Sequence, residues 1–237
     1  MSNGEQTKGY SNFLNIVIWG TMWGIFEATV GYLLHLLPFS VSWLVWYPVA
    51  CFFMANVYRK TSRVSSVLTV GILCASIKML NLLLPGRIDR VINPAISIVF
   101  EASAMALAIF VLNRLCGKKQ KSLPIKAIAA LSMNTGWRLL YILYLLFLVP
   151  DWIREVSVIS SAQKFIPFFV TQNLITSFLL FIGYRFKDVI FRPIEAAEQK
   201  LMSVRAAVAI PAHAMPVLKT CAVILMVCAN IALELLL

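Results

Sequence analysis

The sequence predicts an all-α fold: a polytopic bundle of transmembrane helices with six core helices, a seventh at the end of the chain and a cytoplasmic N-terminus. Of its 237 residues, 60% are hydrophobic and 13% are charged, whereas about a quarter of the residues in a soluble domain are charged. Apolar runs of about twenty residues, enough to cross a hydrocarbon core, recur along the chain. Lipid offers the backbone no hydrogen-bond partners, so these runs are expected to be helices.

Seven apolar segments are each expected to cross the membrane once. They are residues 13–37, 39–58, 64–84, 91–113, 125–149, 165–186 and 217–237. The chain then divides into a cytoplasmic tail (1–12), a six-helix membrane bundle (13–187), a basic amphipathic cytoplasmic linker (188–216) and a C-terminal transmembrane helix (217–237).

The basic residues predict the orientation of the bundle. Three of them lie in residues 59–63, five in 114–126 and five in 185–205, and these are every second connection. Loops rich in Lys and Arg stay in the cytoplasm, so the N-terminus is expected inside the cell. The same rule accounts for the net charge of +11 without a nucleic-acid partner, since no basic surface interleaved with aromatic residues is present.

The linker that follows the sixth segment has helical spacing. Phe186, Ile190 and Ile194 alternate with Lys187 and other charged residues at the period of a helix. A basic amphipathic helix of this kind binds anionic lipid headgroups on the inner leaflet, which makes residues 185–205 a candidate lipid contact. A solvated linker is the alternative interpretation, and the sequence leaves both open.

Polar residues inside the apolar segments mark the candidate site. Ionisable groups at membrane depth are expensive, so they usually face a partner or a cavity. By their depth in each segment they are expected to share one polar cavity in the outer half of the membrane. The candidate substrate-binding residues are Glu27, Lys78, Asn81, Glu101, Asn134, Arg138, Gln172 and Asn173.

Spacing supports the convergence of these residues. In the first segment Gly20, Gly24 and Gly31 form one stripe with Glu27, and small residues on such a stripe let another helix approach closely. These glycines are the candidate helix-packing or partner face. Two acids and two bases suit a polar or zwitterionic small molecule, with the cations receiving a carboxylate or phosphate and the acids an amine, ring N–H or hydroxyl.

Two other interpretations stay open. Glu27 and Glu101 could instead form internal salt bridges with Lys78 and Arg138, as in a structural or assembly protein. An intramembrane enzyme acting on lipid is the third. It is not favoured, because the sequence has no HExxH or GxSxG motif, and His35 and His213 are expected on opposite sides. The five cysteines lack CxxC spacing, so neither a metal nor a cofactor is predicted.

The stretches "GTMWG" (Gly20 to Gly24) and "INPAISIVFEA" (Ile92 to Ala102) carry a family resemblance. In a basic bundle of about six helices, residues 13–187 resemble the substrate-binding S components of energy-coupling factor transporters. The resemblance implies a bacterial plasma-membrane subunit that takes up a vitamin or micronutrient. It also implies that the first helix contacts a transmembrane coupling subunit and that a pair of ATPases supplies the energy. The chain itself has no ATP-binding loop.

Overall fold

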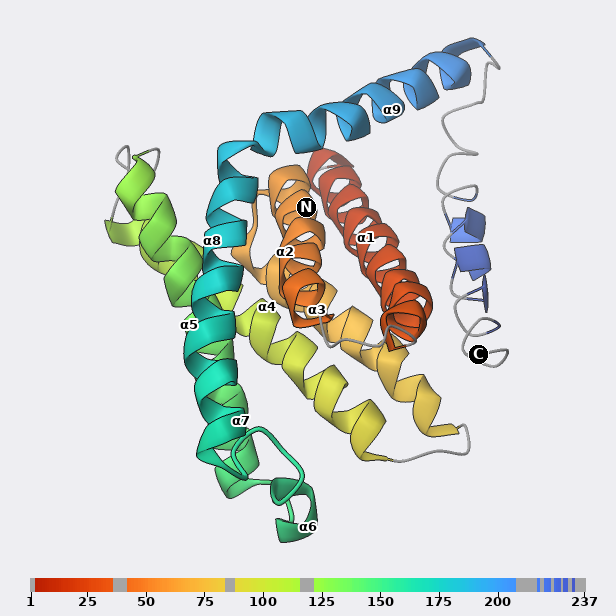
Figure 1. Ribbon diagram of the computed structural model, residues 1–237. Helices are drawn as coiled ribbons and strands as arrows, with labels where there is room; N and C mark the ends of the chain where they lie inside the picture. The colour runs from red at the N-terminus through yellow and green to blue at the C-terminus, as the bar shows by residue number, and fades with distance from the viewer. Residues whose placement is uncertain are drawn as a thin grey trace.

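The computed structural model describes residues 3–35, 42–83, 88–115 and 122–207, together with isolated positions between 217 and 232. Over these residues the fold is helical, with no strand (Figure 1), which confirms the predicted all-α class. The predicted last span, 217–237, falls largely outside the described residues. The helices are α1 (Asn3–His35), α2 (Ser42–Thr61), α3 (Val64–Met79), the 3₁₀ turn η1 (Leu80–Leu83), α4 (Asp89–Leu115), α5 (Leu123–Phe147), α6 (Asp151–Arg154), α7 (Ala162–Ile166), the π-helical turn η3 (Pro167–Thr171), α8 (Gln172–Arg185) and α9 (Lys187–Ala207).

Three stretches of the described chain are long and apolar enough to cross a membrane: Val64–Leu82, Val91–Leu115 and Ala162–Arg185. They match the third, fourth and sixth predicted spans. The first, second and fifth predicted spans are also helical where they are described. A membrane location is therefore supported, while the number of crossings stays a prediction.

Helix α1 continues beyond the predicted span on its N-terminal side. It begins at Asn3 and has 33 residues, so it includes most of the predicted cytoplasmic tail (1–12), whose place outside the membrane stays a prediction. Hydropathy marks only the part of a helix that suits lipid. The polar residues before Phe13, including Gln6 and Lys8, have adequate helix propensity and continue the same helix.

Helix α3 lies between α1 and α4, at close range to both. A methyl group added at Gly71 would come within 2.3 Å of the Ala102 side chain on α4. On the other side, one added at Gly20 of α1 would come within 2.8 Å of Leu73. Small residues therefore set the spacing of all three helices, as in other membrane helix pairs.

Aromatic side chains fill the contact between α1 and α2. Trp23 stacks on Phe53 with ring centroids 6.2 Å apart, and Trp19 meets the same ring edge-on at 6.2 Å. Both tryptophans are buried. They thus belong to the packed interior and not to an aromatic belt at the surface.

The basic helix ends lie together at one end of the bundle. Asn113 at the end of α4 donates to the Tyr58 hydroxyl near the end of α2 at 3.1 Å. Lys126 at the start of α5 lies 5.6 Å from the Tyr184 ring near the end of α8. Helix α9 turns away from the direction of α8 and crosses this same end (Figure 1). The ends of α2 and α4 therefore meet each other, as do the start of α5 and the end of α8, while the alternation of all the spans stays a prediction.

Candidate functional site

Arg138 is the most completely buried Arg, Lys, Asp or Glu side chain among the described residues, with 2% of its surface exposed. Its Nη1 donates to the Phe168 carbonyl at 2.7 Å, and its Nε donates to Asn134 Oδ1 at 3.4 Å. The guanidinium also lies 4.7 Å from the Trp137 ring and 4.6 Å from the Phe168 ring. This cation is held by a carbonyl, an amide and two aromatic faces of its own chain.

A π-helical turn supplies the carbonyl that Arg138 uses. At this turn the Gln172 N–H bonds the Pro167 carbonyl, five residues back. In a regular α-helix that N–H would bond Phe168, four residues back. The Phe168 carbonyl is thus released from its α-helical donor and receives Arg138 instead. Single π turns of this kind are frequent at functional sites.

Asn134 joins α5 to α8. Its side-chain nitrogen donates to the Asn173 carbonyl at 2.8 Å and to Ser177 Oγ at 3.0 Å, and its oxygen accepts Trp137 Nε1 at 2.8 Å. Asn173 in turn donates to Thr135 Oγ1 at 2.9 Å. Two of the amides predicted from sequence, Asn134 and Asn173, therefore converge with Arg138. They bind one another and the backbone of the two helices.

Glu101 on α4 has a different environment. It is 7% exposed, yet no ion pair within 4.0 Å and no hydrogen bond joins it to any described residue. A Glu101–Arg138 ion pair is therefore absent, while the wider alternative of salt bridges among the four ionic residues stays open. Arg138 lies within electrostatic reach of Glu101 and donates two of its five N–H groups to Asn134 and Phe168. Within the described part of the chain, Glu101 is a buried acid without a hydrogen-bond partner.

The hydroxyl of Tyr47 is the second unsatisfied group in this region. It is buried and makes no hydrogen bond of regular geometry to the described residues, and the weak Cys51 thiol on α2 is the one group within hydrogen-bonding reach of it there. Both Glu101 and Arg138 are within electrostatic reach of this hydroxyl, and its ring packs on Trp137 at 5.6 Å. An acceptor acid and a free hydroxyl therefore occur together where α2, α4 and α5 meet.

Glu27 and Lys78 border the same region from α1 and α3. Cys74 of α3 lies within electrostatic reach of Glu27, Lys78 and Glu101. Glu27 accepts a hydrogen bond from Trp23 Nε1 at 3.3 Å. The four predicted ionic residues thus come together in one part of the bundle interior, drawn from four different helices.

The remaining residues predicted from sequence take little part in the polar contacts around Arg138 and Glu101. Gln172 is half-buried and makes no polar side-chain contact with the described chain, because it lies beside Asn173 on another face of α8. Asn81 belongs to the 3₁₀ turn after α3, where it is half-buried. Gly20 and Gly24 are buried, and Gly20 packs against α3 of the same chain. Gly31 lies on the part of α1 whose surroundings are outside the described residues.

Sequence reasoning missed several members of the site. Tyr47 and Cys51 lie in an apolar run with nothing to distinguish them from packing residues. Ser177 follows Asn173 by one helical turn, so its place on the same face of α8 was open to prediction. Thr176 on this helix is fully buried with an unsatisfied hydroxyl, and no spacing rule identifies such a group.

In the described ranges, no three His, Cys, Asp or Glu side chains lie close enough together to hold a metal ion. Comparisons of the chain with protein-family models, with curated proteins and with solved structures gave no match. The site must therefore be interpreted from its own chemistry.

Proposed function

We propose that this chain is a multi-pass membrane transport protein that binds a small polar molecule at Glu101, with a protonated amine or another strong hydrogen-bond donor of that molecule facing the acid. The observation that carries the proposal is the buried Glu101 side chain, which has no hydrogen bond or ion pair to any residue that the structure describes. The role we favour is that of a substrate-binding subunit for uptake. This role follows the expected resemblance to the S components of energy-coupling factor transporters.

The energetics of Glu101 support a ligand. A charged carboxylate buried without a partner is costly, so such groups are usually paired, protonated or bound to something. A ligand that brings a cationic amine would supply the missing charge and a short, charge-assisted hydrogen bond. The Tyr47 hydroxyl, buried without a hydrogen bond near Glu101, offers a second polar contact.

The same contacts narrow the ligand chemistry. The zwitterion expected from the sequence required Arg138 to receive a carboxylate or phosphate. Arg138 already donates two of its five N–H groups to Phe168 and Asn134, so an anion there would share the guanidinium with these acceptors. Glu101 shares its oxygens with no described hydrogen-bond donor. An amine-bearing or otherwise donor-rich molecule therefore fits the site better than an anion does.

The proposed membrane arrangement has six spans in the bundle, a seventh in residues 217–237, and the basic end in the cytoplasm of a bacterial cell. Three apolar helices and the gathering of the basic helix ends at one end support it. A transmembrane coupling subunit and an ATPase pair would then supply the energy, as the resemblance implies. Gly20 is buried against α3, so such a partner would contact other residues of α1.

A structural role is the second candidate, and a specific observation favours it for part of the site. Arg138, Asn134 and Asn173 connect α5 to α8 through hydrogen bonds within the chain. These residues would fasten the bundle whether or not a ligand binds. Glu101 takes no part in this network, and this is why it separates the two functions experimentally.

The test is thermal unfolding of the purified full chain in detergent, with a panel of vitamins, amino acids, polyamines and nucleobases. We expect at least one amine-bearing compound to raise Tm, and Glu101→Gln to abolish the shift while the free protein still folds. Glu155→Gln removes an exposed acid outside the site and is the matched control. No shift with any compound, or a shift that survives in Glu101→Gln, would overturn the proposal.

A further inference from the structure

We propose that α9 lies on the membrane surface and that its exposed face binds anionic phospholipid. This inference rests on the bundle spanning a membrane, but not on the ligand of Glu101. It starts from the way in which α9 is attached. Only Phe186 separates it from α8, and the chain there turns so that α9 runs across the end of the bundle (Figure 1). A helix that leaves a membrane span at this angle lies at the depth of the lipid headgroups.

Aromatic and cationic contacts hold α9 against α2. The Phe191 ring stacks on Phe52 of α2, with centroids 5.8 Å apart and an interplanar angle of 7°. The Arg59 guanidinium lies 4.4 Å from the same Phe191 ring. Ile194, one turn further along α9, packs on the hydrophobic core. One face of α9 is thereby fixed to the protein.

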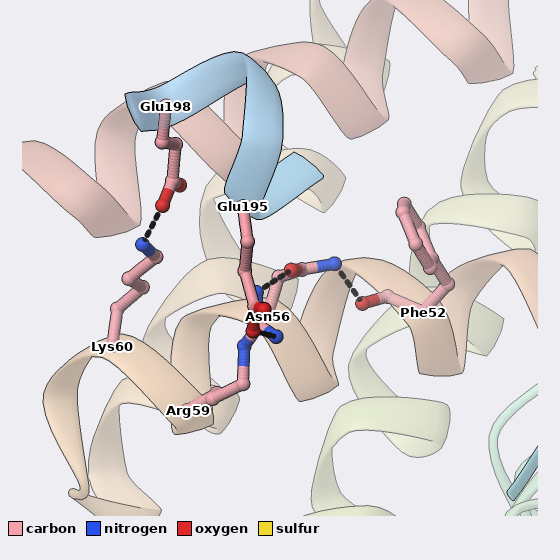
Figure 2. Close-up of polar contacts among 6 residues, drawn as sticks. All are labelled: Phe52, Asn56, Arg59, Lys60, Glu195 and Glu198. Carbon is pink, nitrogen blue, oxygen red and sulfur yellow. Dashed lines mark hydrogen bonds and ion pairs between the residues drawn. The ribbon is translucent and has the colours of Figure 1, made fainter. Parts of the chain in front are cut away.

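Two acids of α9 point towards the end of α2, as Figure 2 shows. Glu195 accepts a hydrogen bond from Arg59 Nη1 at 2.7 Å, and Glu198 forms an ion pair with Lys60. Arg59 is also held by its own helix, because its Nη2 donates to Asn56 Oδ1 at 3.5 Å. The carboxylates that would repel an anionic surface are thus turned towards cations of the same chain.

The rest of α9 presents apolar and basic side chains. Phe186, Val189 and Ile190, at the junction with α8 and on the first turn, are 56%, 63% and 41% exposed. Among the basic residues, Lys187, Arg192 and Lys200 are exposed as well. Apolar side chains that enter the headgroup boundary, beside cations that meet phosphate, are the two attractions that hold a helix on an anionic bilayer.

Charge favours lipid over other occupants of this face. Helix α9 contains four basic and three acidic residues, and two of the acids are paired with α2. Asp188 is therefore the one acid left to oppose four cations. Phosphatidylglycerol or another anionic phospholipid supplies negative charge over the whole plane in which α9 lies. The exposed apolar residues at the junction are then placed against acyl chains.

The test measures lipid selectivity of the full chain in phosphatidylcholine vesicles containing spin-labelled phosphatidylglycerol or spin-labelled phosphatidylcholine. The native chain should immobilise the phosphatidylglycerol spin label more strongly than the phosphatidylcholine spin label. We expect the variant Lys187→Gln/Arg192→Gln/Lys200→Gln to lower this preference by about threefold or more, since each cation at a membrane surface contributes attraction. Lys164→Gln removes an exposed cation near the opposite end, at α7, and should leave the preference unchanged. Equal preference in the native chain and the triple variant would overturn the proposal.

A second measurement tests the orientation of the helix. Benzoylphenylalanine in place of Ile190 should crosslink to lipid on illumination in the same vesicles, whereas the same group in place of the exposed Gln199 should not. On an ideal helix the two positions lie on opposite sides of α9. A crosslink from position 190 to a second protein chain, or the same lipid yield at both positions, would contradict a lipid-facing surface.

Discussion

The guanidinium of Arg138 and the carbonyl of Phe168 are joined by a hydrogen bond of 2.7 Å between α5 and the π-helical turn before α8. The bond depends on both partners. The π turn frees the carbonyl from its α-helical donor, and the buried arginine replaces that donor. Two helices distant in sequence are thus fastened at a point where each alone would leave a buried polar group unsatisfied.

Removal of this fastening is expected to destabilise the protein. Arg138→Ala leaves the Phe168 carbonyl and one acceptor site of Asn134 without their donor, at a cost of about 1–3 kcal/mol for each buried group. Thermal unfolding in detergent measures the change against Arg192→Ala, which removes an exposed arginine. If the two variants melt at the same temperature, Arg138 does not stabilise the bundle.

Asn134 should be more sensitive to substitution than Ser177. Asn134→Leu keeps a similar volume but removes two donated and two accepted hydrogen bonds, whereas Ser177→Ala removes the hydroxyl that accepts one of them. We expect a loss of about 2–4 kcal/mol for the first and about 1 kcal/mol for the second. Equal losses in chemical denaturation would mean that the network is not centred on Asn134.

Glu101→Gln should behave in the opposite way to Arg138→Ala in the free protein. It replaces a buried, unpartnered acid by a neutral group of the same size, so stability should stay the same or rise by on the order of 1 kcal/mol. The measurement is Tm without added compounds. A large drop in Tm would mean that Glu101 holds the bundle together, which would favour the structural role.

Gly71 is expected to tolerate no added methyl group. Its Cβ would lie 2.3 Å from the Ala102 side chain, so Gly71→Ala must separate α3 from α4 and should cost about 1–3 kcal/mol, as other overpacked sites do. Gly183→Ala on α8 meets nothing within 4 Å and should be neutral or stabilising by up to about 1 kcal/mol.

The double variant Gly71→Ala/Ala102→Gly tests whether the cause is steric. It returns one methyl of space at the same contact and should recover most of the loss in Tm. Failure to recover would show that Gly71 acts through something other than its distance from Ala102.

The ion pairs of α9 should influence its lipid preference. Arg59→Gln/Lys60→Gln leaves Glu195 and Glu198 without their cations, so the preference for phosphatidylglycerol should fall although no basic residue of α9 has changed. Adding Glu195→Gln/Glu198→Gln to this variant should restore it. An unchanged preference in the first variant would mean that the two acids do not face the lipid region when unpaired.

The helices of this fold could be predicted from the sequence because apolar runs and basic connections are local signals. The convergence of Glu27, Lys78, Glu101 and Arg138 could also be predicted, because ionic residues in such runs must turn inward. The pairing among them could not. Arg138 donates to the Phe168 carbonyl, which the π turn makes available. No sequence rule predicts a π turn at Pro167, and none predicts that Glu101 forms no ion pair with the other described residues.

The start of α1 at Asn3 could not be predicted from the apolar run that begins at Phe13. Hydropathy reports where lipid is tolerated, whereas a helix ends where its backbone hydrogen bonds end, and in α1 these two limits are far apart. For Gly20, a close contact with another helix was predicted, and such a contact occurs with α3. The role of α1 in binding a partner subunit stays a prediction.

The contact between Gly71 and Ala102 has a mechanical consequence. Two helices with no room for one methyl group between them cannot slide past each other, so α3 and α4 are expected to move as one rigid body. Glu101 precedes Ala102 directly and is carried on this body, while Tyr47 belongs to α2 and Arg138 to α5. Under the proposed function, the motion that admits a molecule to Glu101 is therefore expected where α2 or α5 meets this pair.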